Sequence, residues 1–279
     1  MARLDGRAAA REAVLEAAKL AAAAAFRAPQ LTGKLEIEAE IITHEDQDPI
    51  IEFAGALAPI SPVMAFDYQT MKHFRERDSP LGCLLIGAKL DRSDLGWDCG
   101  ACGFESCAEF NKWSKENGGM GLLWGGPSCV WMLMDWAAAC DFACAAAGQY
   151  RMEARAMGTI GAACAGVGFM PKATARVAVL IGPPGDFVYF SRKQNRDHFP
   201  YEQHRESLLR TSPTNWQAFP GSTKPCIKSR DNWWENMEYV KWEPLSEAEV
   251  QYVNDTMAKV QEVAVKHLPN ITKWYEEKE

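Results

Sequence analysis

Hydrophobic residues recur along the first part of the chain with two different periods. In residues 7–27, alanine, leucine, glutamate, lysine and arginine dominate, and the apolar positions fall on one stripe of a helix. Residues 35–43 alternate between glutamate and aliphatic side chains, which is typical of a half-buried strand. Residues 82–89 form a short apolar run that suits a strand buried on both faces. Helices and strands are therefore expected together in one fold.

The pattern predicts further elements along the rest of the chain. Helices are predicted for residues 46–58, 63–77, 104–115, 129–147 and 152–166. A third strand is predicted at 176–181, ending before a glycine and two prolines. A helix is predicted from Ser246 to His267, because Ser246 and Glu249 have the spacing of a capping box. We therefore expect an α/β (α+β) fold with helices packed on a small mixed sheet.

Residues 186–244 show little periodicity and are rich in tryptophan, proline, asparagine and basic residues. Long segments of this kind are usually functional or disordered. The many aromatic side chains favour order, because disordered segments contain few of them. We therefore divide the chain into residues 1–192 and an extended, aromatic-rich C-terminal arm, 193–279, that ends in a helix.

Composition narrows the class of protein. The chain has 279 residues, 47% of them hydrophobic, which is enough for a large core. With 30 basic and 37 acidic residues the net charge is -7, which argues against nucleic acid as a partner. Charged residues interrupt the alanine-rich stretch 8–25, and no signal-type apolar run precedes it. We expect a soluble, cytoplasmic protein that binds neither nucleic acid nor membranes.

Four of the nine cysteines form a constellation. Cys99, Cys102 and Cys107 have the spacing C-x2-C-x4-C, and Cys129 follows a Gly-Gly-Pro-Ser turn. In a cytoplasmic protein a cysteine framework indicates metal binding or catalysis more often than disulfides, and the odd total argues against complete pairing. Four thiolates from one tight loop and one distant turn are what an iron–sulfur cluster requires.

Zinc is the alternative occupant, because four cysteines also hold zinc in many structural sites. Zinc ribbons usually pair two C-x2-4-C knuckles, whereas here a single distant cysteine completes the set. Plant-type [2Fe–2S] proteins use C-x4-C-x2-C, the reverse order. The spacing therefore favours a [4Fe–4S] cluster and leaves zinc and [2Fe–2S] open.

The residues around the cysteines suit a negatively charged cluster. Gly100 and Gly103 can adopt positive φ, which lets backbone N–H groups turn toward sulfur. A helix beginning near Phe104 would direct its positive N-terminal end at the cluster. Aromatic side chains that would exclude water are Trp97, Phe104, Trp124 and Trp131. We predict Gly100, Gly103, Trp97 and Phe104 as cofactor contacts, and we assign no catalytic residue.

The other cysteines are interpreted mainly as core residues. Cys140 and Cys144 are four residues apart on one apolar helix, Cys83 lies in a buried strand and Cys164 in a helix. Buried cysteines commonly behave as small hydrophobes. Cys226, in the irregular segment, is expected to be the most exposed thiol.

The segment Trp97–Phe110 resembles the iron–sulfur domain, with C-G-x-C-G-x-x-x-C, of corrinoid proteins of acetyl-CoA synthesis and of membrane electron-transport complexes. Over roughly residues 5–192 the chain resembles ferredoxin-domain-containing proteins of unknown function, common in anaerobic bacteria and archaea. The other matching segments are 11–20, 28–29, 85–87, 126–129, 182–183 and 189–190. The resemblance implies a ferredoxin-like domain at 1–192, with one [4Fe–4S] cluster held by Cys99, Cys102, Cys107 and Cys129. It implies no reaction.

The order of elements and the long C-terminal arm are also loosely similar to nitroreductase-like flavoproteins. Such proteins are dimers that bind FMN at their interface, with arms that wrap the partner. This similarity implies Arg7, Arg11 and Arg27 as candidates for a phosphate contact. A solvated helix face is the alternative interpretation of these three arginines.

The expected function is that of an iron–sulfur redox protein that passes single electrons to a partner protein or a bound small molecule. The first alternative is a reductase in which the cluster feeds a flavin. The second is a non-redox (de)hydratase, which needs an iron without a cysteine ligand. We expect sensitivity to air and a homo-oligomer such as a dimer. If the protein is an enzyme, we expect an oxidoreductase.

Overall fold

The computed structural model describes most of the chain. The described residues are 3–77, 79–120, 125–183, 210–211, 226–228, 235, 240–242 and 246–278.

Four strands form the central sheet. Their order is β1 (Ile37–Ile42), β2 (Gly82–Ala88), β6 (Ala175–Gly182) and β5 (Glu153–Met157). Every neighbouring pair in this sheet is antiparallel. The two middle strands are buried along their whole length. Their sequences are apolar except for Arg176 in β6, which is buried as well.

The prediction of a mixed sheet was wrong for these strands. Two helices, α2 (Asp48–Leu57) and α3 (Pro62–Glu76), lie between β1 and β2. The single helix α6 (Gly158–Gly166) lies between β5 and β6, and this pair is antiparallel as well, so a helical connection does not by itself make neighbouring strands parallel. The α+β class is the part of the prediction that holds.

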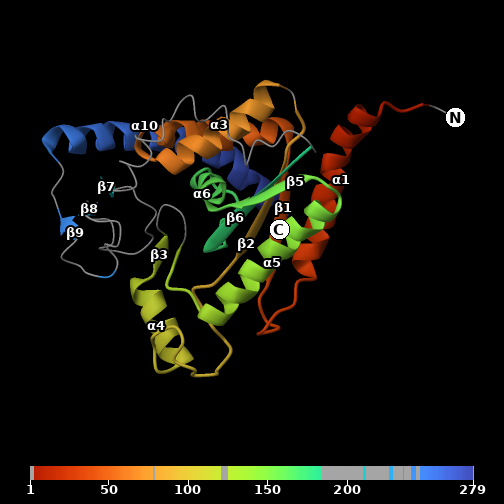
Figure 1. Cartoon of the computed structure of the whole chain (residues 1–279). Coiled ribbons are helices and arrows are strands. Elements are labelled where there is room, and N and C mark those ends of the chain that lie inside the picture. Colours follow the sequence, from red (N-terminus) through yellow and green to blue (C-terminus); the bar gives the residue numbers. More distant parts are fainter. Residues whose placement is uncertain are drawn as a thin grey trace.

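One face of the sheet is covered by α1 (Gly6–Phe26) and α5 (Val130–Gln149) (Figure 1). Leu84 and Ile86 of β2 point into the core on this side. The helix predicted at 7–27 is confirmed as α1, and Asp5 caps it by accepting the backbone N–H of Arg7 and Ala8.

The opposite face is covered by α2, α3, α6 (Gly158–Gly166) and α10 (Glu247–Lys278). Cys83 and Leu85 of β2 join the core on this side, in alternation with the residues that face α1 and α5. The protein therefore has helices on both faces of the sheet, and each face has its own apolar core.

α5 has the length and apolar composition of a membrane-spanning helix. Core helices of soluble proteins share these properties. One side of α5, with Met132, Trp136 and Ala139, packs into the core beside α1 and the sheet.

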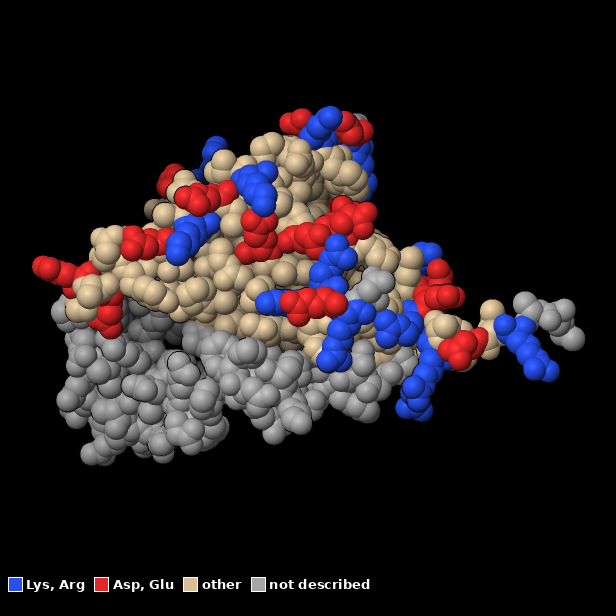
Figure 2. All heavy atoms as spheres, turned by 90° about the horizontal axis from the view of Figure 1, so that it is seen from above, with Lys and Arg blue, Asp and Glu red and all other residues tan. Residues whose placement is uncertain are grey.

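Charges of both signs are mixed on the face seen from above. In Figure 2 lysine and arginine side chains alternate with aspartate and glutamate over that face. Among the described residues, charges of opposite sign form pairs such as Arg75–Asp48, Lys72–Glu76 and Lys266–Glu52, whose places in this view are not marked. Such a surface produces no strong field of one sign.

One predicted helix proved to be two elements. Residues 152–166, predicted as a single helix, form the strand β5 followed by the helix α6. The sequence of β5, Glu-Ala-Arg-Ala-Met, is rich in good helix formers. Pairing with the exposed edge of β6 outweighs this local preference, because tertiary context routinely overrides propensity.

The capping box predicted for the last helix is confirmed. The backbone N–H of Glu249 donates to Ser246 Oγ at 3.3 Å, and the backbone N–H of Ser246 donates to Glu249 Oε2 at 2.9 Å. Reciprocal bonds of this kind satisfy two backbone donors at the start of α10.

α10 runs beyond its predicted end at His267 and includes Pro269. The added turns are anchored by Tyr275, whose hydroxyl donates to Glu40 and accepts the backbone N–H of Met170, both at 2.7 Å. Val260 of α10 also belongs to the core that α2, α3 and α6 form on their face of the sheet. The division of the chain at residue 192 stays a prediction, as does the nitroreductase-like arrangement.

The predicted irregular segment 186–244 is described only in part. It contributes β7 (Arg210–Thr211), β8 (Cys226–Lys228) and β9 (Val240–Trp242), which form a small antiparallel sheet. Apart from Glu235, the remainder of the segment lies outside the described residues. The exposure predicted for the Cys226 thiol also lies outside them.

A buried carboxylate fixes the turn between α1 and β1. Asp135 of α5 is 1% exposed. It accepts the backbone N–H of Leu31 at 2.6 Å, the backbone N–H of Thr32 at 3.0 Å and the Thr32 hydroxyl at 2.5 Å. The turn is thereby tied to the helix that begins beside Cys129.

Replacing Asp135 with alanine is expected to lower the free energy of unfolding by about 3 kcal/mol, because three donors lose a charged acceptor. Asp141 lies on the same helix but is exposed. Asp141→Ala should therefore change the free energy by less than about 0.5 kcal/mol. Urea denaturation measures both variants, and equal losses in the two would contradict the role given to Asp135.

Candidate metal centre

The candidate centre lies where β2 ends and the chain enters the cysteine loop. The backbone of Leu90 just after β2 makes two anchoring bonds: its N–H donates to Thr174 Oγ1 at 2.8 Å, and its carbonyl accepts the N–H of Cys129 at 2.9 Å. The N–H of Gly125 donates to the Thr174 carbonyl at 2.6 Å. Two segments distant in sequence are thereby fixed side by side at one end of the sheet.

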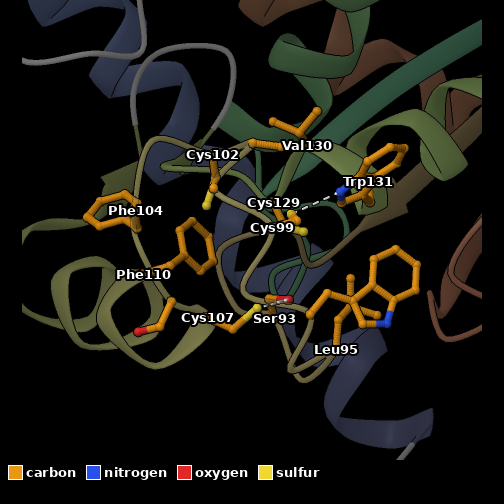
Figure 3. A pocket seen from close by; sticks show the side chains of 14 residues that line it. Ser93, Leu95, Cys99, Cys102, Phe104, Cys107, Phe110, Cys129, Val130 and Trp131 are labelled. Atoms are coloured by element: carbon orange, nitrogen blue, oxygen red, sulfur yellow. Dashed lines mark hydrogen bonds between the residues drawn. The ribbon is translucent and has the colours of Figure 1, made fainter.

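A pocket of about 340 Å³, counting the part open to solvent, lies between these segments (Figure 3). It is lined by Ser93, Leu95, Trp97, Cys99, Gly100, Ala101, Cys102, Phe104, Ser106, Cys107, Phe110, Cys129, Val130 and Trp131. The four cysteines of the constellation are all in this lining. Of the predicted cofactor contacts, Trp97, Gly100 and Phe104 are in it, and Gly103 is not.

Gly103 instead shapes the turn behind the pocket. Its N–H donates to the carbonyl of Gly100 at 2.9 Å. The two glycines have φ values of 86° and 71°, which confirms the predicted left-handed backbone. The turn brings Cys99 and Cys102 to the same hollow.

Two cysteines stand at helix N-termini. α4 (Cys107–Asn117) begins at Cys107, with Ser106 as its cap, and Cys129 is the cap residue of α5. The helix predicted from residue 104 therefore starts three residues later, because the Ser106 hydroxyl accepts the N–H of Glu109 and ends the loop there. Negative charge on sulfur is favoured at such helix ends.

Cys107 is surrounded by hydrogen-bond donors. The backbone N–H of Asp98 lowers the pKa of this thiol, Ser93 and the N–H groups of Trp97 and Gly96 act in the same direction, and burial opposes them. The Ser93 hydroxyl lies 3.7 Å from Cys107 Sγ. Residues 96 and 98 have positive φ, at 62° and 47°. Left-handed residues of this kind can turn successive N–H groups toward an anion.

Cys99 has a donor of a different kind. The indole Nε1–H of Trp131 donates to Cys99 Sγ at 3.1 Å (Figure 3). Trp97 lies edge-on to Trp131, with ring centroids 6.1 Å apart. Cys99 and Trp97 are both exposed. The pocket is therefore open to solvent on this side.

The opposite wall of the pocket is apolar. Phe110 of α4 is fully buried and meets Phe104 edge-on, with centroids 5.7 Å apart. Cys129 is also buried, at 6% exposure. Trp124, which was predicted to help exclude water, lies outside the described residues.

The residues present fit a cluster with several metal atoms. Four thiols face one hollow, two helix N-termini meet it, and N–H and O–H groups point at two of the sulfurs. In a cluster each thiolate binds its own iron, so the sulfurs need not converge on one point. In the part of the chain that the structure describes, no group of three or more His, Cys, Asp or Glu residues is arranged to hold one metal ion.

The remaining described cysteines lie away from the pocket. Cys83, Cys140 and Cys164 are buried, which confirms their predicted core role, and Cys144 packs against the same core as Cys140. Burial raises the pKa of Cys140 to about 12 and that of Cys144 to about 11. Burial therefore disfavours the thiolate form of Cys140 and of Cys144.

Sequence reasoning missed several residues of the pocket. Phe110 was discoverable, because it follows Cys107 by three positions and so shares its helix face. Ser93 carries no such signal. It reaches Cys107 only because Asn111 of α4 binds the Ser93 backbone N–H and carbonyl, both at 2.7 Å.

Comparisons with known proteins give two matches. The sequence model of a family described as "Uncharacterized protein containing a ferredoxin domain" (DUF2148) matches residues 125–192, which include Cys129. An "Uncharacterized protein" from Archaeoglobus fulgidus is 30% identical over 181 residues, covering 65% of this chain and 92% of that protein. No solved structure matches the chain.

Proposed function

Since the chain belongs to a family of uncharacterised proteins that contain a ferredoxin domain, we propose that it is a redox protein with one [4Fe–4S] cluster. The proposed ligands are Cys99, Cys102, Cys107 and Cys129. The cluster would supply reversible one-electron transfer. The electron would pass to a partner protein or to a bound small molecule.

The observation that carries this proposal is the meeting of four cysteines at one pocket. They come from a loop after β2 and from the start of α5, and the Leu90 backbone joins these two segments. A ferredoxin domain indicates an iron–sulfur protein, and four thiolates are the ligand set of a cuboidal cluster.

The surrounding residues support electron transfer in particular. Phe104 and Phe110 would exclude water from one side of the cluster, which helps to set its potential. On the other side Cys99 is exposed, and Trp97 is 48% exposed. A ligand at the surface gives an electron a short route to a docked partner. Four cysteine ligands leave no open iron, which disfavours the (de)hydratase alternative.

Anaerobic purification followed by metal, sulfide and flavin analysis tests the proposal. We expect iron and acid-labile sulfide in equal amounts, and a broad brown absorption that dithionite bleaches. Loss of both iron and sulfide on exposure to air is also expected. Colourless protein with stoichiometric zinc would refute the proposal. Yellow bands released by acid would establish the flavin-dependent reductase instead.

A further inference from the structure

Two side chains from different elements donate hydrogen bonds to ligand sulfurs. Trp131, in the first turn of α5, reaches Cys99 Sγ at 3.1 Å. Ser93, in the loop after β2, reaches Cys107 Sγ at 3.7 Å. Figure 3 shows both contacts at the pocket. The indole has no acceptor site, so its N–H can only donate to the sulfur.

We propose that Trp131 sets the reduction potential of the proposed cluster by donating its indole N–H to Cys99 Sγ, and that Ser93 assists at Cys107. The inference rests on the proposed function. Trp131 is a positioning residue in this account: it binds a ligand atom and does not itself exchange the electron.

The direction of the effect follows from charge. Reduction adds one negative charge to the cluster, and the cysteine sulfurs share it. A hydrogen bond to a more negative acceptor is stronger, so the N–H stabilises the reduced form more than the oxidised form. Hydrogen bonds to the sulfurs are among the features that raise iron–sulfur potentials.

The position of Trp131 is well defined by its surroundings. It follows Cys129 by two residues, so the helix that begins at one proposed ligand also carries the donor to another. The edge-on contact with Trp97 supports the plane of its ring. Packing alone would let either tryptophan shield the proposed cluster from water. The indole N–H of Trp131 also donates to Cys99 Sγ, whereas Trp97 acts on Cys107 through its backbone N–H, which Trp97→Phe retains.

Trp131→Phe keeps an aromatic ring and removes the donor. We expect the iron content to stay at the wild-type value and the potential to fall. The one-electron equilibrium should shift about tenfold, which corresponds to 59 mV.

Trp97→Phe is the matched control, because Trp97 lies on the same solvent-exposed side of the pocket, and it should shift the equilibrium less than about threefold. Ser93→Ala should lower the potential by less than Trp131→Phe, because its contact is longer. Redox titration followed by electron paramagnetic resonance measures all three.

Wild-type protein labelled with ¹⁵N in the tryptophan indoles provides a second measurement. Pulsed electron paramagnetic resonance of the reduced cluster should detect a nitrogen coupling, and that coupling should vanish in Trp131→Phe and persist in Trp97→Phe. Equal shifts of potential in the two phenylalanine variants, or absence of the coupling from an iron-loaded wild type, would overturn the inference. Wild-type protein without iron would overturn the proposed function itself, and the inference with it.

Discussion

Replacing Cys102 with serine is expected to remove most of the iron from anaerobically purified protein. Cys102 lines the pocket from the middle of the C-x2-C-x4-C loop. A serine hydroxyl is a far weaker iron ligand than a thiolate, because it stays protonated near neutral pH. Changing a residue that only supports a metal ligand typically costs 10–100-fold in affinity, so loss of a ligand should cost at least about that much.

Cys144→Ser is the matched control for this variant. Cys144 is partly exposed on α5 and is not part of the pocket lining. Iron per chain in both variants, measured by plasma mass spectrometry, should be reduced only in Cys102→Ser. Retention of full iron by Cys102→Ser, with an unchanged spectrum, would remove Cys102 from the ligand set.

Replacing Gly161 with alanine is expected to cost about 3 kcal/mol of folding free energy. α6 packs so closely on β6 that a Cβ at Gly161 would lie 2.4 Å from the carbonyl oxygen of Arg176 and 2.9 Å from the Cα of Val177. Both are backbone atoms, so a change of rotamer cannot relieve the clash. Either α6 or β6 therefore has to move. Thr174, the residue directly before β6, bonds to Leu90 and Gly125 and so helps to hold the cysteine loop in place.

Gly148→Ala isolates the effect of the close contact. Gly148 is also a helical glycine, but nothing lies within 4 Å of a Cβ built there. Alanine at that position should be neutral or should stabilise the protein by up to about 1 kcal/mol, because glycine is a poor helix former. Chemical denaturation of the two variants gives the comparison. A Gly161→Ala protein as stable as the wild type would show that α6 and β6 are less tightly packed than described.

The candidate centre was largely predictable because its chemistry is local. Three of the cysteines lie within nine residues, and the glycines between them, Gly100 and Gly103, adopt the positive φ that glycine permits and that was predicted for them. Cys129 is separated from them in sequence, yet its position before an apolar helix was also visible. What brings it to the pocket is the Leu90 carbonyl, and no local pattern reveals that contact.

The fold was predictable to the extent that each element depends on its own residues. The alternating strand at 37–42, the apolar strand at 82–88 and the alanine-rich helix at 6–26 all form where their patterns predict. β5 does not, because it exists only through its pairing with β6. The direction of each strand pair likewise depends on how the intervening helices pack, which the periodicity of one segment does not encode.

The native mass of the intact chain, recorded after anoxic purification, tests the central claim most directly. The wild-type chain is expected to carry the added mass of four irons and four sulfides, and the Cys102→Ser protein is expected to lack it. A wild-type mass equal to that of the bare polypeptide, or of the polypeptide with a single zinc ion, would contradict the claim.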